Sequence, residues 1–546
     1  MTTDPFAAYL PYTIGAHGTM LPGAAAHDVP ADDLFGSIEA FVGSLLDGRA
    51  TPTELHRPAA TLAAFVVSPN LAVTVDLLSV RPSHVQCLLA ALRREPPLDQ
   101  RGLLVGHTID PAAGLALWTR AGPAVADVAV RAWRAIVTAG EVEPLVALTT
   151  PWLYGNKLRL TRFIAPVAVT SLPTGAPVLD LMAGTGIVAR ALSDRHPVSV
   201  NDPNPYASLL SRCHWIDAGN IKPADLLAAL RPAYAENPER LARLIGSRLE
   251  EESAFLHGNP DYDAMLRYTT FTQADILQVT DGKESDVARL TTERYSNVYF
   301  GIAQAVEIDS LRSAIEHVFS TPSTERELCL CALLLACTSC ATGPHFAQPV
   351  LPRSLKAFQT IVERRARSVA WEFDLALARL AARRLPTFPM GDATGLDWRG
   401  ALEVFANRAS GGPAGVYIDP PYSKLQYSRY YHVLNVLLSY DYPPIAGAGR
   451  YPPRNHRFSS RLEYQPGIAQ REITDLLRAA ADKGLTTILS YGEGGFASMD
   501  SLARAMAGLY VRVELFSEEL RHHSQGRPLG ASRATVLEYL LVGHPT

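Results

Sequence analysis

The chain has 546 residues, 47% of them apolar, and a formal net charge of −4 at neutral pH. Such a length predicts two or three domains, and the charge excludes nucleic-acid binding through a global positive field, so any such contact needs local basic patches. Six cysteines without regular spacing argue against a disulfide framework, and no apolar run reaches membrane-spanning length or resembles an amino-terminal signal. We therefore expect a soluble protein of the reducing cytoplasm.

The first part of the chain, residues 1–145, alternates apolar stretches with proline and glycine breaks. This pattern predicts a mainly helical region. No motif in it indicates a chemistry, so its role stays open.

The next recognisable element contains Tyr154, Gly155 and Lys157, shortly before a predicted strand. Its glycine allows close approach of the backbone to a ligand, and its lysine could lie near a carboxylate. An ordinary turn with a solvated lysine is equally compatible with these residues.

Residues 177–192 predict a strand, a glycine turn and a helix. Gly184 and Gly186 permit the tight turn and bring backbone N–H groups close to a ligand. Ala189 stands where a dinucleotide fingerprint has its third glycine, a replacement that some such sites accept. Asp180 precedes the turn, and a carboxylate there would repel a pyrophosphate but attract an ammonium or sulfonium group. The pattern therefore indicates S-adenosylmethionine (SAM) rather than NAD.

Two further acids are candidates for binding the same nucleotide. Asp202 follows the second predicted strand about twenty residues after the glycine turn, which suits hydrogen bonds to ribose hydroxyls. Asp392 follows a short apolar run and could accept from the adenine amino group, with the N–H of Ala393 opposite. A plain Asp-containing turn is the alternative at both places.

Residues 206–384 interrupt this nucleotide fold, and their apolar periodicity predicts mostly helix. Within them Arg353, Lys356 and Arg364 belong to a basic stretch with interleaved aromatic residues, which could follow phosphates. A solvated helix face explains the same stretch. The cysteines between 329 and 340 lie mostly in an apolar run, where cysteine behaves as a small hydrophobic residue, so we predict no zinc site.

The most informative stretch begins after residues 416–418, which predict the end of a buried strand. Pro420 and Pro421 prevent the strand from continuing, so Asp419 and Tyr422 are expected at the carboxyl edge of a sheet, where open α/β sheets bind ligands. The Asp419 carboxylate and the Pro420 carbonyl could accept hydrogen bonds from an exocyclic amine while Tyr422 stacks on the ring. A chance strand-to-turn junction could carry the same letters.

Hydrogen-bonding, aromatic and basic side chains follow this stretch. They suit an extruded base and its flanking phosphates, although rings that pack inward at a helix start are an alternative. The last part of the chain alternates predicted helices and strands. The adjacent His522 and His523 have no carboxylate at ligand spacing, so no metal is predicted. The candidate contact residues are Gln426, Tyr427, Arg429, Arg454 and Arg457.

Taken together, these motifs resemble the amino-methylating DNA methyltransferases with an Asp-Pro-Pro-Tyr motif, and among them the Dam-like DNA adenine methylases. The resemblance covers residues 150–205 and 385–546. Met182 departs from it, because the family usually has an aromatic residue there. The cofactor-binding residues that the resemblance implies are Tyr154, Gly155, Lys157, Asp180, Met182, Ala183, Gly184, Gly186, Asp202, Asp392 and Ala393.

The resemblance implies an α/β fold with a Rossmann-like SAM-dependent methyltransferase sheet, formed by residues 146–205 and 385–546. Residues 206–384 would be a large helical insertion and a possible target-recognition segment, and residues 1–145 a mainly helical region. The implied activity is methyl transfer to N6 of a flipped adenine in double-stranded DNA, in restriction-modification or phage defence. Alternatives are N4-cytosine methylation, RNA methylation and a non-catalytic DNA-binding subunit. The implied catalytic residues are Asp419, Pro420, Pro421 and Tyr422.

Overall fold

A computed structural model describes residues 12–14, 20–22, 157, 160–219, 221–257, 261–273, 287–343, 345–383, 385–409, 411–421, 426–492, 495–521 and 535–545. Tyr154, Gly155, Tyr422 and the histidine pair lie outside the described residues, as does nearly all of 1–145.

The chain divides into two compact units. The sheet unit comprises residues 154–216, 385–447 and 451–546, and the helical unit comprises 1–153, 217–384 and 448–450. The division falls at Asp217, so helix α9 (Pro205–Cys213) belongs to the sheet unit and not to the insertion expected from residue 206. In the first part of the chain, β1 (Tyr12–Ile14) and β2 (Met20–Pro22) form an antiparallel pair.

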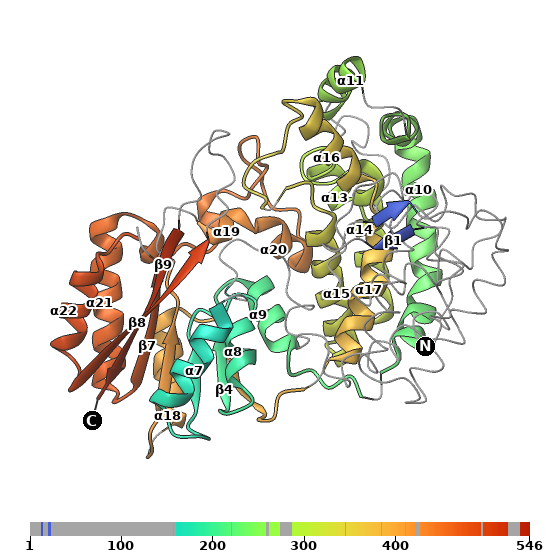
Figure 1. Ribbon diagram of the computed structural model, residues 1–546. Helices are drawn as coiled ribbons and strands as arrows, with labels where there is room; N and C mark the ends of the chain where they lie inside the picture. Colours follow the sequence, from blue (N-terminus) through green and yellow to red (C-terminus); the bar gives the residue numbers. More distant parts are fainter. Residues whose placement is uncertain are drawn as a thin grey trace. The chain divides into compact units, whose positions relative to one another are not determined.

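A seven-stranded sheet of order β5-β4-β3-β6-β7-β9-β8 forms the centre of the sheet unit (Figure 1). Neighbouring strands from β5 to β7 are parallel, whereas β9 is antiparallel to both β7 and β8. The expected mixed α/β fold with a mostly parallel sheet is confirmed. The strands are β3 (Val178–Asp180), β4 (Val198–Asn201), β5 (Met390–Thr394), β6 (Gly415–Ile418), β7 (Thr486–Gly492), β8 (Arg512–Arg521) and β9 (Thr535–His544).

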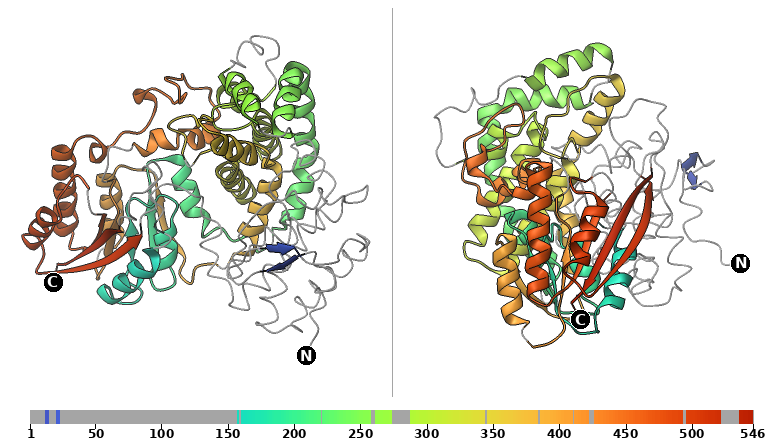
Figure 2. Two further views of the ribbon diagram at one scale, coloured as in Figure 1. Left: turned by 45° about the horizontal axis from the view of Figure 1, so that its top comes forward. Right: turned by 90° about the vertical axis from the view of Figure 1, so that its left-hand side faces the viewer.

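The central strands are buried along their whole length, as is typical of parallel strands covered on both faces. On one face, α18 (Trp398–Arg408), α21 (Pro466–Asp482) and α22 (Met499–Ala507) supply a shared core with β3, β6 and β7. Right-handed crossovers place the helices of the β3-to-β4 connection on the other face. Figure 2 shows helices on both sides of the strands. On this second face α8 (Ile187–Leu192) and α9 contact the strands, α7 (Thr161–Ser171) contacts α8, and α20 (His432–Ser439) contacts α9.

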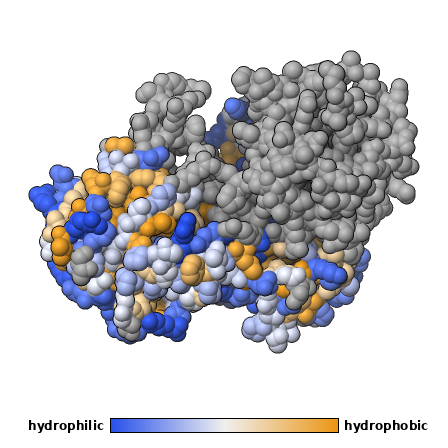
Figure 3. Space-filling view, turned by 60° about the horizontal axis from the view of Figure 1, so that its bottom comes forward, coloured by the Kyte–Doolittle hydropathy of each residue, from blue (hydrophilic) through white to orange (hydrophobic). Residues whose placement is uncertain are grey.

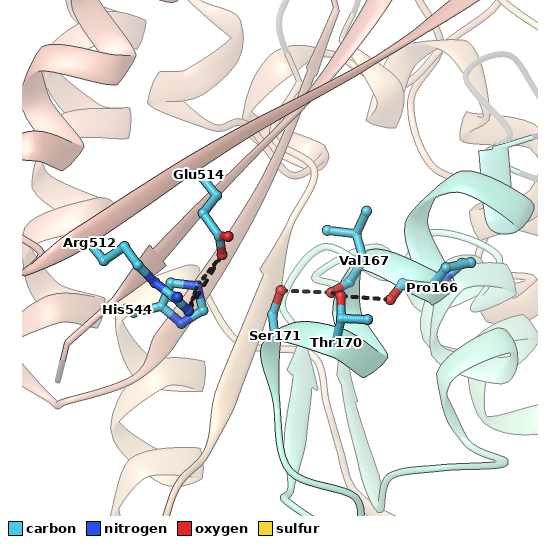
Figure 4. Close-up of polar contacts among 7 residues, drawn as sticks. All are labelled: Pro166, Val167, Thr170, Ser171, Arg512, Glu514 and His544. Carbon is cyan, nitrogen blue, oxygen red and sulfur yellow. Dashed lines mark hydrogen bonds and ion pairs between the residues drawn. The ribbon is translucent and has the colours of Figure 1, made fainter.

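Polar side chains at the amino edge of the parallel strands stabilise local structure (Figure 4). In α7 the hydroxyls of Thr170 and Ser171 donate to the Val167 carbonyl. Across β8 and β9, Nε2 of His544 lies 2.7 Å from Oε2 of Glu514. Figure 3 shows apolar patches between polar residues on this side of the molecule.

The helical unit is built around α14 (Ile302–Val318), which contacts α10, α15 and α17. The buried Glu252 accepts from the backbone N–H groups of Ile302 and Ala303 at 2.8 and 2.9 Å, where the positive end of the α14 dipole favours a carboxylate. Its other helices are α10 (Pro223–His257), α11 (Tyr262–Gln273), α13 (Leu290–Arg294), α15 (Thr324–Cys340), α16 (Leu355–Arg365) and α17 (Val369–Ala382).

The cysteines of α15 are core residues. Cys329, Cys331, Cys337 and Cys340 are fully buried, and burial raises the pKa of Cys337 and Cys340 well above the ordinary thiol value. Among the helices that the structure describes, none has the length and apolar character needed to cross a membrane.

We predict that Glu252→Ala lowers the free energy of unfolding by about 1–3 kcal/mol, because it leaves two buried N–H groups unsatisfied. Urea denaturation measures the change. The neighbouring Glu251→Ala is the control, since Glu251 is exposed and pairs with Arg248 at 2.9 Å, a kind of contact that contributes about 0.2–1 kcal/mol. Equal effects of the two substitutions would contradict the assigned role of Glu252.

Candidate active site

The candidate site lies at the carboxyl edge of β3 and β6, where the order of the sheet reverses. Chain connections run from β3 to β4 on one side and from β6 to β7 on the other, so the crevice between these two strands is a topological switch point. Asp180 of β3 is level with Tyr417 of β6, and Asp419 follows two residues later. The adjacency therefore brings together the two motifs that the sequence places far apart.

The glycine turn after β3 requires left-handed backbone at two positions, with φ of 53° at Gly184 and 74° at Gly186. A Cβ on Gly186 would lie 2.6 Å from the Ser211 backbone, so this glycine serves close packing against α9. A Cβ on Gly184 would meet nothing within 4 Å, so the turn is open on that side. The N–H of Ala183 donates to the Asn201 carbonyl at 2.9 Å, which ties the turn to β4.

Asp202 holds this turn through its carboxylate. Its Oδ2 accepts from the Gly184 N–H at 3.1 Å, and its Oδ1 accepts from the backbone and side-chain nitrogens of Asn204 at 2.9 and 3.1 Å. Burial raises the pKa of Asp202 above its usual range. Carboxylate oxygens have further acceptor positions, so these bonds are compatible with the expected contact to ribose hydroxyls.

Asp180 is a buried carboxyl group with incomplete hydrogen bonding. Its side-chain Oδ2 accepts from the Ala189 N–H at 3.1 Å, whereas Oδ1 has no hydrogen-bond partner within the described residues. Burial, followed by repulsion from Asp419 and, more weakly, from Asp202, raises the pKa of Asp180 to about 8. A cation placed beside this group would stabilise its ionised form.

Asp419 is paired with the buried Lys157, whose Nζ lies 3.2 Å from Asp419 Oδ1 and 2.5 Å from Glu538 Oε1. The expectation that Lys157 lies near a carboxylate is confirmed. Side-chain exposure is 19% for Asp419 but 7% for Lys157 and 5% for Glu538, so Asp419 is the member of the group that faces outward. Burial raises the pKa of Asp419 to about 6, an effect that Lys157 opposes and Glu538 reinforces.

For Asp392 the sequence predicts a position before the next strand and a hydrogen bond from the adenine amino group of the cofactor, and the structure differs in the position. Asp392 lies inside β5, an edge strand, where its N–H donates to the Ser199 hydroxyl and its carboxylate pairs with Arg408 of α18. Thr394, two residues later, is level with the end of β4, and the adjacent Ala393 is exposed. The strand extends through Asp392, and its carboxylate forms an ion pair at the sheet edge.

The remaining predicted cofactor and catalytic positions lie on the two loops. Met182 is half-buried and packs against the core of the α18 face, while Ala183 is buried. Pro420 is buried and Pro421 is half-buried, directly after β6. Together with Asp419 they form the described part of the Asp-Pro-Pro-Tyr motif.

The predicted contact residues after β6 form a connected cluster in the sheet unit. Arg457 donates to Gln426 at 2.8 Å, and the guanidinium groups of Arg457 and Arg429 lie 5.7 and 5.1 Å from the ring of Tyr451. Burial and the charge of Arg429 lower the pKa of Arg457. Arg454 is exposed and lies over the Tyr464 ring at 4.6 Å.

Tyr427 begins the short helix α19 (Tyr427–Tyr430), and its backbone N–H donates to the buried Glu463 at 3.1 Å. Its ring lies 6.3 Å from that of Tyr431, which lies 5.7 Å from Tyr206 of α9. Burial raises the pKa of Glu463 to about 7.

The basic stretch of the helical unit contains fewer exposed cations than its sequence indicates. Arg353 and Lys356 are exposed, whereas Arg364 is half-buried and lies 3.4 Å from the Ser339 carbonyl. Arg365 is a core residue, 1% exposed, that donates to the Tyr268 hydroxyl at 2.6 Å.

Several site residues were not singled out from the sequence. Asn201, at the end of β4, joins the segments that follow β3 and β5, because its side chain bonds to Leu181, Thr394 and Leu396. Glu538 is an acid inside the apolar run of β9, a signal that could have indicated a buried ion pair. It accepts from the Ser490 hydroxyl of β7 at 2.8 Å. Within the described residues there is no cluster of three side chains suited to hold a metal ion.

The chain is 24% identical over 382 residues to the modification methylase LlaI of Lactococcus lactis subsp. lactis. The aligned part is 68% of this chain and 51% of that protein, so the chain spans about half the length of this relative. No protein-family model matches the chain, and no solved structure matches it.

We predict that Asp180→Asn flattens the pH dependence of stability. Between pH 3.8 and about 8 the unfolded chain has released a proton that folded Asp180 retains. The wild-type free energy of unfolding therefore falls as the pH rises, by up to about 1.4 kcal/mol per pH unit from this group. Denaturant unfolding from pH 5 to pH 8.5 measures the slope, with the exposed Asp475→Asn as control. Equal slopes in all three proteins would exclude a protonated Asp180.

Proposed function

We propose that this chain is a DNA methyltransferase that transfers a methyl group from SAM to the exocyclic N6 amine of a flipped adenine. The observation that carries the proposal is the juxtaposition of Asp419 with the glycine turn at the switch point of a mostly parallel sheet. The seven-stranded order with an antiparallel β9 is compatible with a methyltransferase fold. Similarity to a modification methylase supports the same reaction class.

The residues at the switch point fit SAM. The turn is open at Gly184, and the buried acids Asp180 and Asp419 lie at the adjacent strand ends with an orphaned carboxylate oxygen on Asp180. Such a set attracts a positive group and disfavours a pyrophosphate. When bound, SAM supplies an electrophilic methyl group on a positively charged sulfur. Asp202 would bind the ribose, and Lys157 would act on Asp419 rather than on the cofactor.

Asp419 and the Pro420 carbonyl would accept hydrogen bonds from the two N–H groups of the target amine. These hydrogen bonds would weaken conjugation of the nitrogen lone pair with the ring. They would also direct the lone pair at the methyl carbon of SAM. Attack by the nitrogen would break the carbon–sulfur bond, with its electron pair kept by sulfur, and Asp419 or water would take the proton that the nitrogen loses. Positioning and electrostatics would supply the rate, with no covalent enzyme intermediate.

The target base must leave the duplex stack to reach this edge. Tyr422 is proposed to stack on it, and Gln426, Tyr427 and Arg429 to contact the base and its neighbours. Arg454 and Arg457, with Arg353, Lys356 and Arg364 of the helical unit, are proposed phosphate contacts. We propose residues 206–384 as a target-recognition segment, and we propose a role in restriction-modification or phage defence in the cytoplasm.

The reaction is tested by transfer of labelled methyl groups from SAM to unmethylated duplex DNA, followed by digestion to nucleosides. We expect label in N6-methyladenine and a loss of at least about a hundredfold in Asp419→Asn, because an amide is a far weaker acceptor for the amine. Asp482→Asn, exposed at the end of α21, is the matched control.

Each other outcome identifies an alternative. Label in N4-methylcytosine would indicate that Asp419 binds the exocyclic amine of cytosine and not that of adenine. Label on RNA but not DNA would change the substrate. DNA binding without any transfer would indicate a non-catalytic subunit, and full activity of Asp419→Asn would refute the proposed site.

For DNA binding we predict that Arg454→Ala weakens affinity similarly for all sequences. Its guanidinium is exposed, so the slope of log K against log salt concentration should fall by about 1, the value expected for one lost phosphate contact. Fluorescence anisotropy at several salt concentrations measures both effects. Arg478→Ala, exposed on α21, is the control, and an unchanged slope in Arg454→Ala would remove Arg454 from the interface.

A further inference from the structure

A buried chain of polar groups lies behind Asp419. The Ser490 hydroxyl of β7 donates to Glu538 Oε1 at 2.8 Å, and the same oxygen accepts from Lys157 Nζ at 2.5 Å. Lys157 Nζ then lies 3.2 Å from Asp419 Oδ1. Hydrogen bonds and ion pairs therefore link three separate segments of the sheet unit to the Asp419 carboxylate through Lys157.

The buried chain of polar groups behind Asp419 contains more negative than positive charge. One ammonium lies between two carboxylates, so the group keeps a net negative charge when all three are ionised. Glu538 is 4% exposed and lies on a strand whose neighbouring residues are apolar, so it does not reach a ligand directly. Glu538 must therefore influence the site through Lys157.

We infer that Glu538 is a positioning residue that holds Lys157 and shares its charge, so that Asp419 stays a strong acceptor for the target amine. Without Glu538, Lys157 and Asp419 would form a neutral pair in a buried site, and the acceptor strength of Asp419 would fall with its basicity. The inference rests on the proposed methyl transfer, in which Asp419 accepts hydrogen bonds from the amine.

The groups that face Asp419 set the direction of each change in its protonation. Lys157 lowers the pKa of Asp419, whereas Glu538 of β9 raises it. Asp180 of β3 and the buried Tyr417 of β6 are the other titratable neighbours of Asp419, and neither is substituted in the test. Removing the charge of Glu538 and removing that of Lys157 should therefore shift the acid limb of the kcat profile in opposite directions.

The test compares Glu538→Gln, Lys157→Met and wild type over pH 5 to 8.5, with SAM affinity measured by calorimetry on the full chain. In Glu538→Gln we expect kcat to fall about tenfold and the acid limb to move about half a pH unit lower. In Lys157→Met the acid limb of the kcat profile should move to higher pH. The SAM Kd of Glu538→Gln should stay within about twofold of wild type, because Glu538 does not contact the cofactor.

Two further variants keep the outcome decisive. Glu514→Gln, on β8 of the same hairpin, should leave kcat, pH profile and Kd unchanged. Ser490→Ala removes the hydroxyl that holds Glu538, and it should lower kcat by about two- to fivefold and move the acid limb of the kcat profile. It replaces Glu538→Gln if that variant does not fold.

The inference is overturned if Glu538→Gln, or Ser490→Ala in its place, keeps the wild-type kcat and acid limb. It is also overturned if SAM affinity and Tm fall in parallel with activity, which would indicate a purely structural role. An inactive wild-type protein would refute the proposed function itself, so the two failures are distinguishable.

Discussion

The burial of several carboxylates around a single ammonium is the constraint on which the site depends. Asp180, Asp419 and Glu538 lie at the same edge of the sheet. Lys157 is the cation that pairs with Asp419 and Glu538. Buried charges are costly unless they are paired, and an excess of negative charge raises the pKa of the least well paired acid. Asp180 is that acid, because burial, followed by repulsion from Asp419, raises its pKa to about 8.

The topology of the sheet produces this arrangement. Because β3 and β6 are neighbours, the glycine turn and the Asp419 loop meet at one crevice. Because β9 is inserted antiparallel beside β7, Glu538 arrives from the carboxyl-terminal hairpin within reach of Lys157. Asn201 and Asp202 then fix the glycine turn from β4. The acceptor on Asp419 is thus supported by strands on both sides.

Local patterns in the sequence were sufficient to predict the position of residues that follow the end of a strand. Asp180, Gly184, Asp202 and Asp419 each come next to a short apolar run, and the structure places all of them at the carboxyl edge.

The rest depends on contacts between distant segments. Whether Asp392 ends a strand or lies within it is set by pairing of β5 with β4, which a local pattern does not contain. Glu538 becomes a site residue only through the β7–β9 register, and Arg365 leaves the basic stretch for the core because Tyr268 and Thr342 surround it. In each case tertiary packing decides the role of a charged side chain.

The most direct test of the account is calorimetric titration of the wild-type chain with SAM and with S-adenosylhomocysteine, in buffers of different ionisation enthalpy near pH 7.5. The two ligands differ by one methyl group and one positive charge on sulfur. If that charge lies beside Asp180 and Asp419, SAM binding must release protons that S-adenosylhomocysteine binding does not release. Absence of SAM binding, or equal proton release with both ligands, would contradict the assignment of this sheet edge as a methyl-transfer site.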